Sequence, residues 1–249
     1  MDIQLSYGDQ NLHRKVGKII RNRSANKEDI REIAKEAIDL KTIHRILDLG
    51  CGYGWFEETL AGDFDLIVGI DYVANNRRKF LEATEKIAKK AMFKRMHLPC
   101  QIEMPSGSFD LIISAYSLYF FPDIIAEVRR LLHADGIFLI ITHSESMLEE
   151  GQKYFQFKNL RKVIERFSSE RGEAILRPYF SRIQYIDYLN DLVFARDNAV
   201  ELEDYIHFKS EFVAKDIAPE VLKEKLLYEL KERGILRLSK NDRIFLARK

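Results

Sequence analysis

The chain has 249 residues, of which 46% are hydrophobic and 32% charged, so it can bury a substantial core as a folded globular protein. Its 40 basic and 39 acidic residues leave a net charge of +1, which excludes a global electrostatic attraction to nucleic acid or to an anionic membrane. Two cysteines are too few for a disulfide framework, and the first residues lack the apolar core of a signal peptide. We therefore expect a cytoplasmic protein, and we expect no transmembrane segment because the longest apolar runs have only strand length.

Apolar residues at helical spacing predict two opening helices, over Leu12–Ile20 and Ile30–Ile38. A strand is expected at Ile46–Leu49, followed by a glycine cluster, a helical stretch at Trp55–Leu60 and a second strand at Leu66–Ile70. The alternation continues with a charged helix at 73–91, a weak strand at 93–98, a strong strand at 109–114, a helix at 123–133 and a strand at 137–142. Alternating strands and helices predict a parallel sheet covered by helices on both faces.

The pattern changes after Thr142. We expect a long polar helix to about Glu170, a strand at Arg182–Leu189, two further helices and a last strand at Arg243–Ala247. The connections to these two strands do not follow the regular strand–helix alternation of the first half. The two strands are therefore expected to add an antiparallel edge to the sheet, with helices inserted between them.

Three alternating glycines follow the first strand directly, in the run ILDLGCGYG. Glycine has no Cβ and tolerates positive φ, so the backbone at Gly50, Gly52 and Gly54 can approach a ligand closely at the carboxyl end of that strand. Asp48 lies two residues before this turn, and Asp71 ends the second strand. A carboxylate in the position of Asp71 can accept hydrogen bonds from both hydroxyls of an adenosine ribose.

With this turn, the sequences GID, MPSGSFDLIISAYSLYFFPD and EVRRLLHADGIFLIIT follow in an order that resembles the class I S-adenosylmethionine-dependent methyltransferases, in particular the type 11-like group with a small-molecule-type core. The motifs cover roughly residues 40–143, and the closing IFLARK is similar to the family's last strand. The resemblance implies an α/β fold with a Rossmann-like, seven-stranded, mostly parallel sheet, helices on both faces and an antiparallel C-terminal strand. It also implies one methyltransferase domain over 1–249, with a helical lid at 1–40, a cofactor-binding core at 41–143, and helical insertions and terminal strands at 144–249.

The implied cofactor is S-adenosyl-L-methionine, with the glycines along its methionine portion, Asp71 at its ribose and the end of the fourth strand beside its sulfonium. The expected cofactor-binding residues are Asp48, Gly50, Cys51, Gly52, Tyr53, Gly54, Asp71, Tyr72, Gln101, Ser114 and Ala115. The stretch around Gln101 departs from the family pattern, because many relatives carry an aspartate there that bonds the adenine amino group. The side-chain oxygen of Gln101 can accept the same hydrogen bond.

Methyl transfer is an in-line displacement at a sulfonium carbon, so the protein mainly has to align the reacting atoms in a dry pocket. His143 directly follows the fifth strand and is the first candidate for a catalytic base, the alternative being a histidine at the surface or core edge. Tyr116 is the second catalytic candidate, and Tyr119 is a candidate to orient the acceptor or simply to pack a helix start. Tyr7 and His13 lie in the segment that resembles the lid, where they either contact substrate or contribute packing.

The sequence bears on three other functions. A nicotinamide-dependent oxidoreductase needs a third glycine three residues after Gly52, where Trp55 stands instead. A methyltransferase-like protein that binds without catalysis stays open, as does methylation of RNA or protein. Neutral charge and the lack of a clear nucleic-acid signature favour a small-molecule acceptor. No Cys/His cluster has zinc spacing, and no metal is expected.

Overall fold

The computed structural model describes residues 10–150, 158–210 and 219–249. The chain forms two compact units, which are described separately. The larger unit consists of Glu28–Thr142, Arg166–Tyr188 and Arg243–Lys249. The smaller unit consists of the described parts of Met1–Lys27, His143–Glu165 and Leu189–Asp242. The division predicted from the sequence, with boundaries after residues 40 and 143, stays a prediction.

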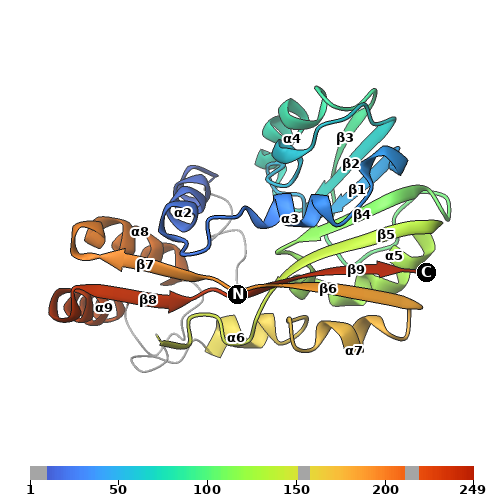
Figure 1. The fold of residues 1–249 in the computed structure, drawn as a ribbon. Coiled ribbons are helices and arrows are strands. Elements are labelled where there is room, and N and C mark those ends of the chain that lie inside the picture. Colours follow the sequence, from blue (N-terminus) through green and yellow to red (C-terminus); the bar gives the residue numbers. More distant parts are fainter. Residues whose placement is uncertain (1–9, 151–157, 211–218) are drawn as a thin grey trace. The chain divides into compact units, whose positions relative to one another are not determined.

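A seven-stranded sheet in the order β3-β2-β1-β4-β5-β9-β6 is built on the larger unit (Figure 1). Its strands are β1 (Arg45–Leu49), β2 (Leu66–Asp71), β3 (Ala91–Arg95), β4 (Phe109–Ala115), β5 (Leu132–His143), β6 (Arg182–Tyr188) and β9 (Asp242–Arg248). The pairs β1–β2, β1–β4, β2–β3 and β4–β5 are parallel. The N–H of Ser181 donates to the carbonyl of Arg248, and Arg243 pairs with Asp187, so β9 runs antiparallel to β6. The predicted fold class is confirmed, and the antiparallel pair of β9 and β6 forms one edge of the sheet, as expected, with β6 outermost.

Helices cover both faces of this sheet because successive strand residues point to opposite sides. The helices of the larger unit are α3 (Ile30–Glu36), α4 (Arg77–Thr84), α5 (Ile125–Leu131) and α7 (Gly172–Leu176). On one face, Ile137 and Leu139 of β5 belong to the same buried cluster as residues of α3 and α4. On the other face, Phe138 packs against Phe180, and Phe245 of β9 packs against Phe167.

Three helix predictions in and beside this unit need correction. The helix expected at 73–91 ends at Thr84, whose hydroxyl bonds back to the carbonyl of Phe80, and Ala91 already pairs with Ile67 in the sheet. Trp55–Leu60 contains only the short 3₁₀ turn η2 (Glu57–Thr59), since the chain must return at once to β2. The helix expected to reach Glu170 ends at Ile164, and just beyond it the hydroxyl of Thr142 donates to the carbonyl of Phe167.

A two-stranded antiparallel sheet and four helices form the described part of the smaller unit. The small sheet pairs β7 (Asp191–Ala195) with β8 (Ile235–Ser239), and the helices are α2 (Gln10–Arg23), α6 (Lys158–Ile164), α8 (Ala199–Ser210) and α9 (Pro219–Arg233). Phe194 and Leu238 of the small sheet are buried in one cluster with Tyr205 of α8 and Val16 of α2. The two opening helices and the two late helices were predicted, whereas the small sheet was not.

Candidate functional site

The glycine turn after β1 is shaped by three residues in left-handed conformations. Gly50, Gly52 and Gly54 have φ values of 73°, 54° and 87°, which a residue with a side chain adopts only with strain. The N–H of Gly50 donates to the carbonyl of Ile70 at 2.8 Å, so the turn stays attached to β2. A Cβ added at Gly50 would lie 2.5 Å from that of Ser117, but one added at Gly52 would meet nothing within 4 Å. The backbone at Gly52 therefore faces open space into which a ligand can come.

Asp71 ends β2 and holds the glycine turn in place. Its Oδ2 accepts a hydrogen bond from the N–H of Gly52 at 2.9 Å, and its Oδ1 accepts from the N–H of Val73 at 2.7 Å and from Nδ2 of Asn76 at 3.4 Å. Burial raises the pKa of Asp71, while these hydrogen bonds oppose the rise. Because each carboxylate oxygen has two lone pairs, Asp71 can anchor the turn and still accept from a ligand hydroxyl.

Tyr72, beside Asp71, presents an aromatic surface at the carboxyl ends of β2 and β3. Its side chain is 42% exposed and meets His97 edge to face, with 5.2 Å between ring centroids. The guanidinium of Arg95 lies 5.7 Å from the Tyr72 ring, and its Nε donates to the carbonyl of Tyr72 at 3.2 Å. A flat aromatic ligand can stack on such a surface. Tyr72 was predicted from the sequence, but Arg95 and His97 were not, because only the β2–β3 pairing brings them beside it.

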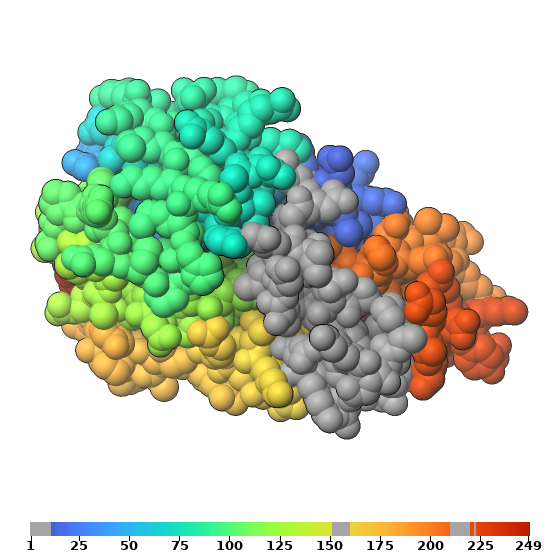
Figure 2. All heavy atoms as spheres, turned by 180° about the vertical axis from the view of Figure 1, so that it is seen from behind, coloured from blue at the N-terminus to red at the C-terminus, as the bar shows by residue number. Residues whose placement is uncertain are grey.

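Gln101 lies in the connection between β3 and β4, whose green atoms are at the surface in Figure 2, and its side chain is exposed. The next residue, Ile102, is buried, and its N–H donates to Glu127 of α5 at 2.8 Å. The structure thus fixes the connection next to Gln101, while its contact with adenine stays a prediction.

The end of β4 is tied to the end of β1 by two buried serines. The hydroxyls of Ser114 and Ser117 are 2.6 Å apart, and that of Ser117 donates to the carbonyl of Leu49 at 2.6 Å. Ser114 and Ala115 therefore lie next to the strand that carries the glycine turn, as expected of residues at the cofactor. Their contact with the cofactor itself stays a prediction.

Tyr116 follows β4 in a strained backbone conformation, with a φ of 56°. Its N–H donates to the carbonyl of Ile141 at 2.8 Å, which holds it to β5. Its ring packs against Trp55 with 5.6 Å between centroids. Trp55 directly follows Gly54, so an aromatic pair lies between the end of β4 and the glycine turn.

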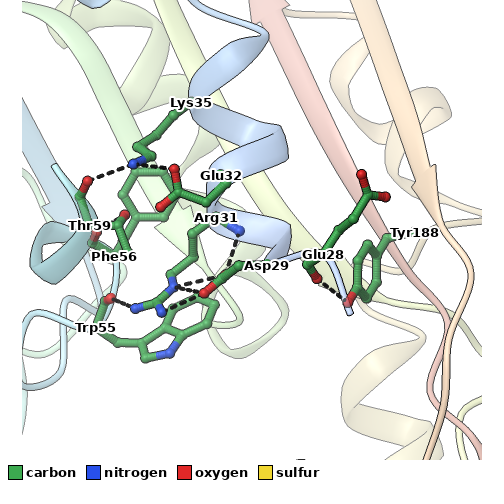
Figure 3. Close-up of polar contacts among 9 residues, drawn as sticks. All are labelled: Glu28, Asp29, Arg31, Glu32, Lys35, Trp55, Phe56, Thr59 and Tyr188. Atoms are coloured by element: carbon green, nitrogen blue, oxygen red, sulfur yellow. Dashed lines mark hydrogen bonds and ion pairs between the residues drawn. The ribbon is translucent and has the colours of Figure 1, made fainter. Parts of the chain in front are cut away.

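Helix α3 holds Trp55 through Arg31, as Figure 3 shows. The Arg31 guanidinium lies 4.7 Å from the Trp55 ring centroid and donates to the Trp55 carbonyl at 2.6 Å. The same guanidinium pairs with Asp29, whose carboxylate also caps α3 by accepting from the N–H of Arg31. One turn later, Lys35 donates to the carbonyl of Thr59 at 2.6 Å (Figure 3). This arrangement was not predicted, since a buried arginine on a short helix has no local signature in the sequence.

Two buried carboxyl groups lie on either side of the glycine turn in the sequence. Asp48 of β1 is 2% exposed and Glu57 of η2 is 1% exposed, and the charge of Glu57 acts on Asp48. Oδ1 of Asp48 and both carboxyl oxygens of Glu57 have no hydrogen-bond partner among the described residues. Burial raises the pKa of Asp48 well above its usual range, with the charges of Glu57 and Asp71 adding to the rise, and burial raises the pKa of Glu57 to about 7. Asp48 was predicted as a site residue from the sequence, whereas Glu57 was not.

His143 is buried at the end of β5 and bonded to Asp242. Its Nδ1 lies 2.7 Å from Oδ1 of Asp242, whose Oδ2 accepts from Nζ of Lys240 at 2.6 Å. Burial lowers the pKa of His143 to about 4, more than the neighbouring carboxylate raises it. His143 is therefore neutral at physiological pH and oriented by a carboxylate, as a proton acceptor can be. Its catalytic role stays a prediction.

The remaining candidates lie in packed surroundings or outside the described residues. Tyr119 is buried and packs against Phe120 with 4.7 Å between centroids. His13 of α2 stacks on Phe208 of α8 at 5.7 Å, and burial lowers its pKa to about 4. Tyr7 lies outside the described residues.

The other turn residues, Cys51 and Tyr53, are buried, and burial raises the pKa of the Cys51 thiol well above its usual range. A thiol in that state does not act as a nucleophile. In the described parts of the chain, no group of three or more His, Cys, Asp or Glu side chains is arranged to hold a metal ion. In the same residues, no helix is long and apolar enough to cross a membrane.

Three solved structures share the fold. The YcgJ protein of Bacillus subtilis is 18% identical, with a TM-score of 0.56 over 95% of this chain and 99% of that chain. The [4+2]-cyclase SpnF is 16% identical, with a TM-score of 0.57 over 98% of this chain and 96% of that chain. A Haemonchus contortus phosphoethanolamine N-methyltransferase, solved with phosphomonomethylethanolamine and S-adenosylhomocysteine, is 19% identical, with a TM-score of 0.57 over 98% of this chain and 58% of that chain. At these identities the likeness shows the fold alone.

In sequence, no curated protein matches the chain. A family model described as a methyltransferase domain does match, over residues 12–190, which is more than half of the chain. The match spans the glycine turn, Asp71 and the end of β4. The chain therefore belongs to the methyltransferase domain family, as the resemblance of its motifs to the class I S-adenosylmethionine-dependent methyltransferases predicted.

Proposed function

We propose that the chain binds S-adenosyl-L-methionine at the glycine turn and transfers its methyl group to a small-molecule acceptor. The observation that carries the proposal is the open backbone at Gly52, held by the carboxylate of Asp71. A cofactor with an amino-acid end and a ribose fits this arrangement, because the turn admits close approach and Asp71 can accept from the ribose hydroxyls. Tyr72 offers a stacking surface for the purine, next to Asp71.

When bound, the cofactor supplies an electrophilic methyl group. The chain's own contribution is alignment and the exclusion of water, for which the tied ends of β1 and β4 provide a rigid support. The aromatic faces of Trp55 and Tyr116 favour a cation in their neighbourhood. His143, neutral and hydrogen-bonded to Asp242, is proposed to take up a proton from the acceptor.

A small-molecule acceptor is supported by the absence of a charge excess in the sequence and, as an analogy of fold, by the small molecule phosphomonomethylethanolamine bound to the Haemonchus contortus enzyme. We further propose a cytoplasmic location. One solved structure with the same fold is named as a cyclase. Methyl transfer therefore has to be tested by detecting the methylated product, because cofactor binding alone does not demonstrate it.

The first test is calorimetric titration of S-adenosylmethionine and, separately, NAD into the wild-type protein, Asp71→Ala and Asp71→Asn. We expect S-adenosylmethionine alone to bind, and the variants to lose about 10- to 100-fold in affinity, as for hydrogen bonds to a charged group. Because Asp71 also holds Gly52 and Val73, thermal unfolding without ligand separates a lost ligand contact from a collapsed turn.

Binding of NAD in place of S-adenosylmethionine would overturn the proposal. If neither ligand binds, the chain would instead be a binding module that does not use this cofactor. If S-adenosylmethionine binds, mass spectrometry of candidate acceptors for a gain of one methyl group decides between an enzyme and a non-catalytic protein.

A further inference from the structure

The smaller unit contains a cluster of buried ionisable side chains away from the glycine turn in the sequence. Its members come from the end of β5, from α8 and from the junction of β8 and β9, and each is at least nine-tenths buried: His143, Tyr205, Lys209, Lys240 and Asp242. Lysine side chains are rarely buried this deeply unless they are paired or bind something.

Ammonium groups outnumber carboxylates in this cluster. Nζ of Lys240 lies 2.6 Å from Oδ2 of Asp242, so these two charges balance each other. Lys209 is the second ammonium group. Burial lowers the pKa of Lys209 to about 7, the charge of Lys240 adds to the fall, and the charge of Asp242 opposes it. Asp204, also on α8, pairs with Lys15 instead. The five side chains of the cluster thus hold two ammonium groups and one carboxylate.

Aromatic rings and imidazoles stand around Lys209. Its Nζ lies 5.9 Å from the ring centroid of Tyr205 and 5.6 Å from that of Phe208. Helix α2 lies against α8 (Figure 1), and His13 of α2 stacks on Phe208. Burial lowers the pKa values of His13 and His143, and the charge of Lys209 adds to the fall in both. An anion beside Lys209 would therefore be attracted by the ammonium and would also favour protonation of these imidazoles.

Tyr205 supplies a hydrogen-bond donor on the same side of α8. Tyr205 and Lys209 are four positions apart, which places them on one face of the helix. The hydroxyl of Tyr205 has no hydrogen-bond partner among the described residues, although the side chain is buried. Burial raises the pKa of Tyr205 and the charge of Asp242 adds to the rise, so the phenol keeps its proton. A buried hydroxyl without a partner is costly, and an oxyanion would accept its hydrogen bond.

We propose that Lys209 and Tyr205 bind a carboxylate or phosphate group, and that this group belongs to the methyl acceptor. One oxygen of the anion accepts from the ammonium group of Lys209, and another accepts from the phenol of Tyr205. The bound anion also raises the pKa of His143, which is proposed to take up a proton from the acceptor. The assignment to the acceptor rests on the proposed function, whereas binding of the anion does not require the cofactor.

The first test titrates acetate and, separately, inorganic phosphate into the wild-type protein at constant ionic strength, which is kept with sodium chloride. NMR follows the ring signals of His143, which are identified by their loss in His143→Gln. We expect a saturable shift with a Kd of about 1 to 10 mM for at least one anion, and a higher measured pKa of His143 in its presence. The tighter-bound anion distinguishes a carboxylate acceptor from a phosphate acceptor.

Two variants and two matched controls locate the site. Lys209→Met and Tyr205→Phe should each weaken the tighter-bound anion by about tenfold or more, as for hydrogen bonds to a charged group. Lys225→Met and Tyr228→Phe remove the same charge and the same hydroxyl at exposed positions of α9 and should bind as wild type does. Tyr205→Phe should keep the wild-type Tm, because the hydroxyl has no protein partner to lose. It therefore tests the site even if Lys209→Met does not fold.

A titration without a saturable shift for either anion, or one that neither Lys209→Met nor Tyr205→Phe weakens, would overturn the inference and leave the proposed function standing. Failure of S-adenosylmethionine to bind would overturn the proposed function, and with it the assignment of the anion site to the acceptor.

The chemical class of the acceptor is tested with pairs of compounds and S-adenosylmethionine. Carboxylic acids are compared with their primary amides, and phosphate esters with the free alcohols, by mass spectrometry for a gain of one methyl group. We expect the gain in charged members of the pairs. Equal turnover of charged and neutral members would overturn the assignment.

Discussion

Gly52 is the residue at which a side chain would compete directly with the proposed cofactor. Alanine at its φ of 54° costs roughly 1–2 kcal/mol in backbone strain. Its Cβ would meet no protein atom within 4 Å, so the protein has room for it. We expect Gly52→Ala to fold and to bind S-adenosylhomocysteine at least about tenfold more weakly, because the methyl group occupies the ligand's space. Calorimetry measures the affinity.

Gly107 provides the matched control for this change. It also has a positive φ, of 69°, and a Cβ added there also meets nothing within 4 Å, but it precedes β4 and so lies at the other end of that strand. Gly107→Ala should carry the same strain and keep wild-type affinity. Equal losses of affinity in the two variants would mean that strain, and not occupancy of the site, causes the effect.

At the scale of an element, helix α3 fixes the segment that follows the glycine turn. Arg31 contacts the ring and the carbonyl of Trp55, which is the single tryptophan of the chain. We expect Arg31→Met to lower the free energy of unfolding by about 2 kcal/mol, because Asp29 and the Trp55 carbonyl lose a buried charged donor. Trp55 fluorescence should shift to longer wavelength as its ring becomes wetter, and cofactor affinity should fall.

Lys35→Met is the control on the same helix. Lys35 is also largely buried and also donates to a backbone carbonyl, but at Thr59, away from Trp55. This variant should lose stability without the fluorescence shift. A shift of the same size in both variants would show that the helix as a whole, rather than the Arg31 contact, holds Trp55.

At the scale of the whole molecule, the two units should respond oppositely to acid. In the smaller unit, burial lowers the pKa of His143 to about 4 from 6.5. The unfolded chain therefore binds a proton at His143 more readily than the folded one, so the free energy of unfolding is highest above about pH 6.5 and decreases as the pH falls toward 4. In the larger unit, burial raises the pKa of Glu57 to about 7 from 4.5, so the folded state gains stability as the pH falls from 7 toward 4.5.

We therefore expect acidification from about pH 7.5 to about pH 5.5 to destabilise the smaller unit by about 1 kcal/mol through His143 and to stabilise the larger one. Hydrogen exchange, corrected for the intrinsic effect of pH, should show β7 and β8 opening more readily while β1 and β4 become better protected. His143→Gln, which can still donate to Asp242, should reduce the first change, and Glu57→Gln should reduce the second. Parallel changes in both units would contradict the prediction.

Much of the fold could be predicted because its signals are local in the sequence. The run Ile46–Leu49 before alternating glycines marks a strand that ends at a ligand-binding turn, and Asp71 at the end of the next strand marks its partner. Predictions failed where pairing between distant segments overrides local preference. Ala91 enters the sheet beside Ile67 although the residues before it favour a longer helix, and the two-stranded β7–β8 sheet pairs Asp191 with Ser239 although two helices separate these strands in the sequence.

The sequence by itself therefore determined the class of fold, the family and the turn at which the cofactor is proposed to bind, since these depend on short motifs and on regular spacing. Only the tertiary structure decided which charged groups are buried together. Glu57 meets Asp48, Arg31 meets Trp55, and His143 meets Asp242, 99 residues later in the chain. The electrostatics of a carboxyl or an imidazole depend on burial and on neighbours within a few ångströms, and sequence spacing alone specifies neither.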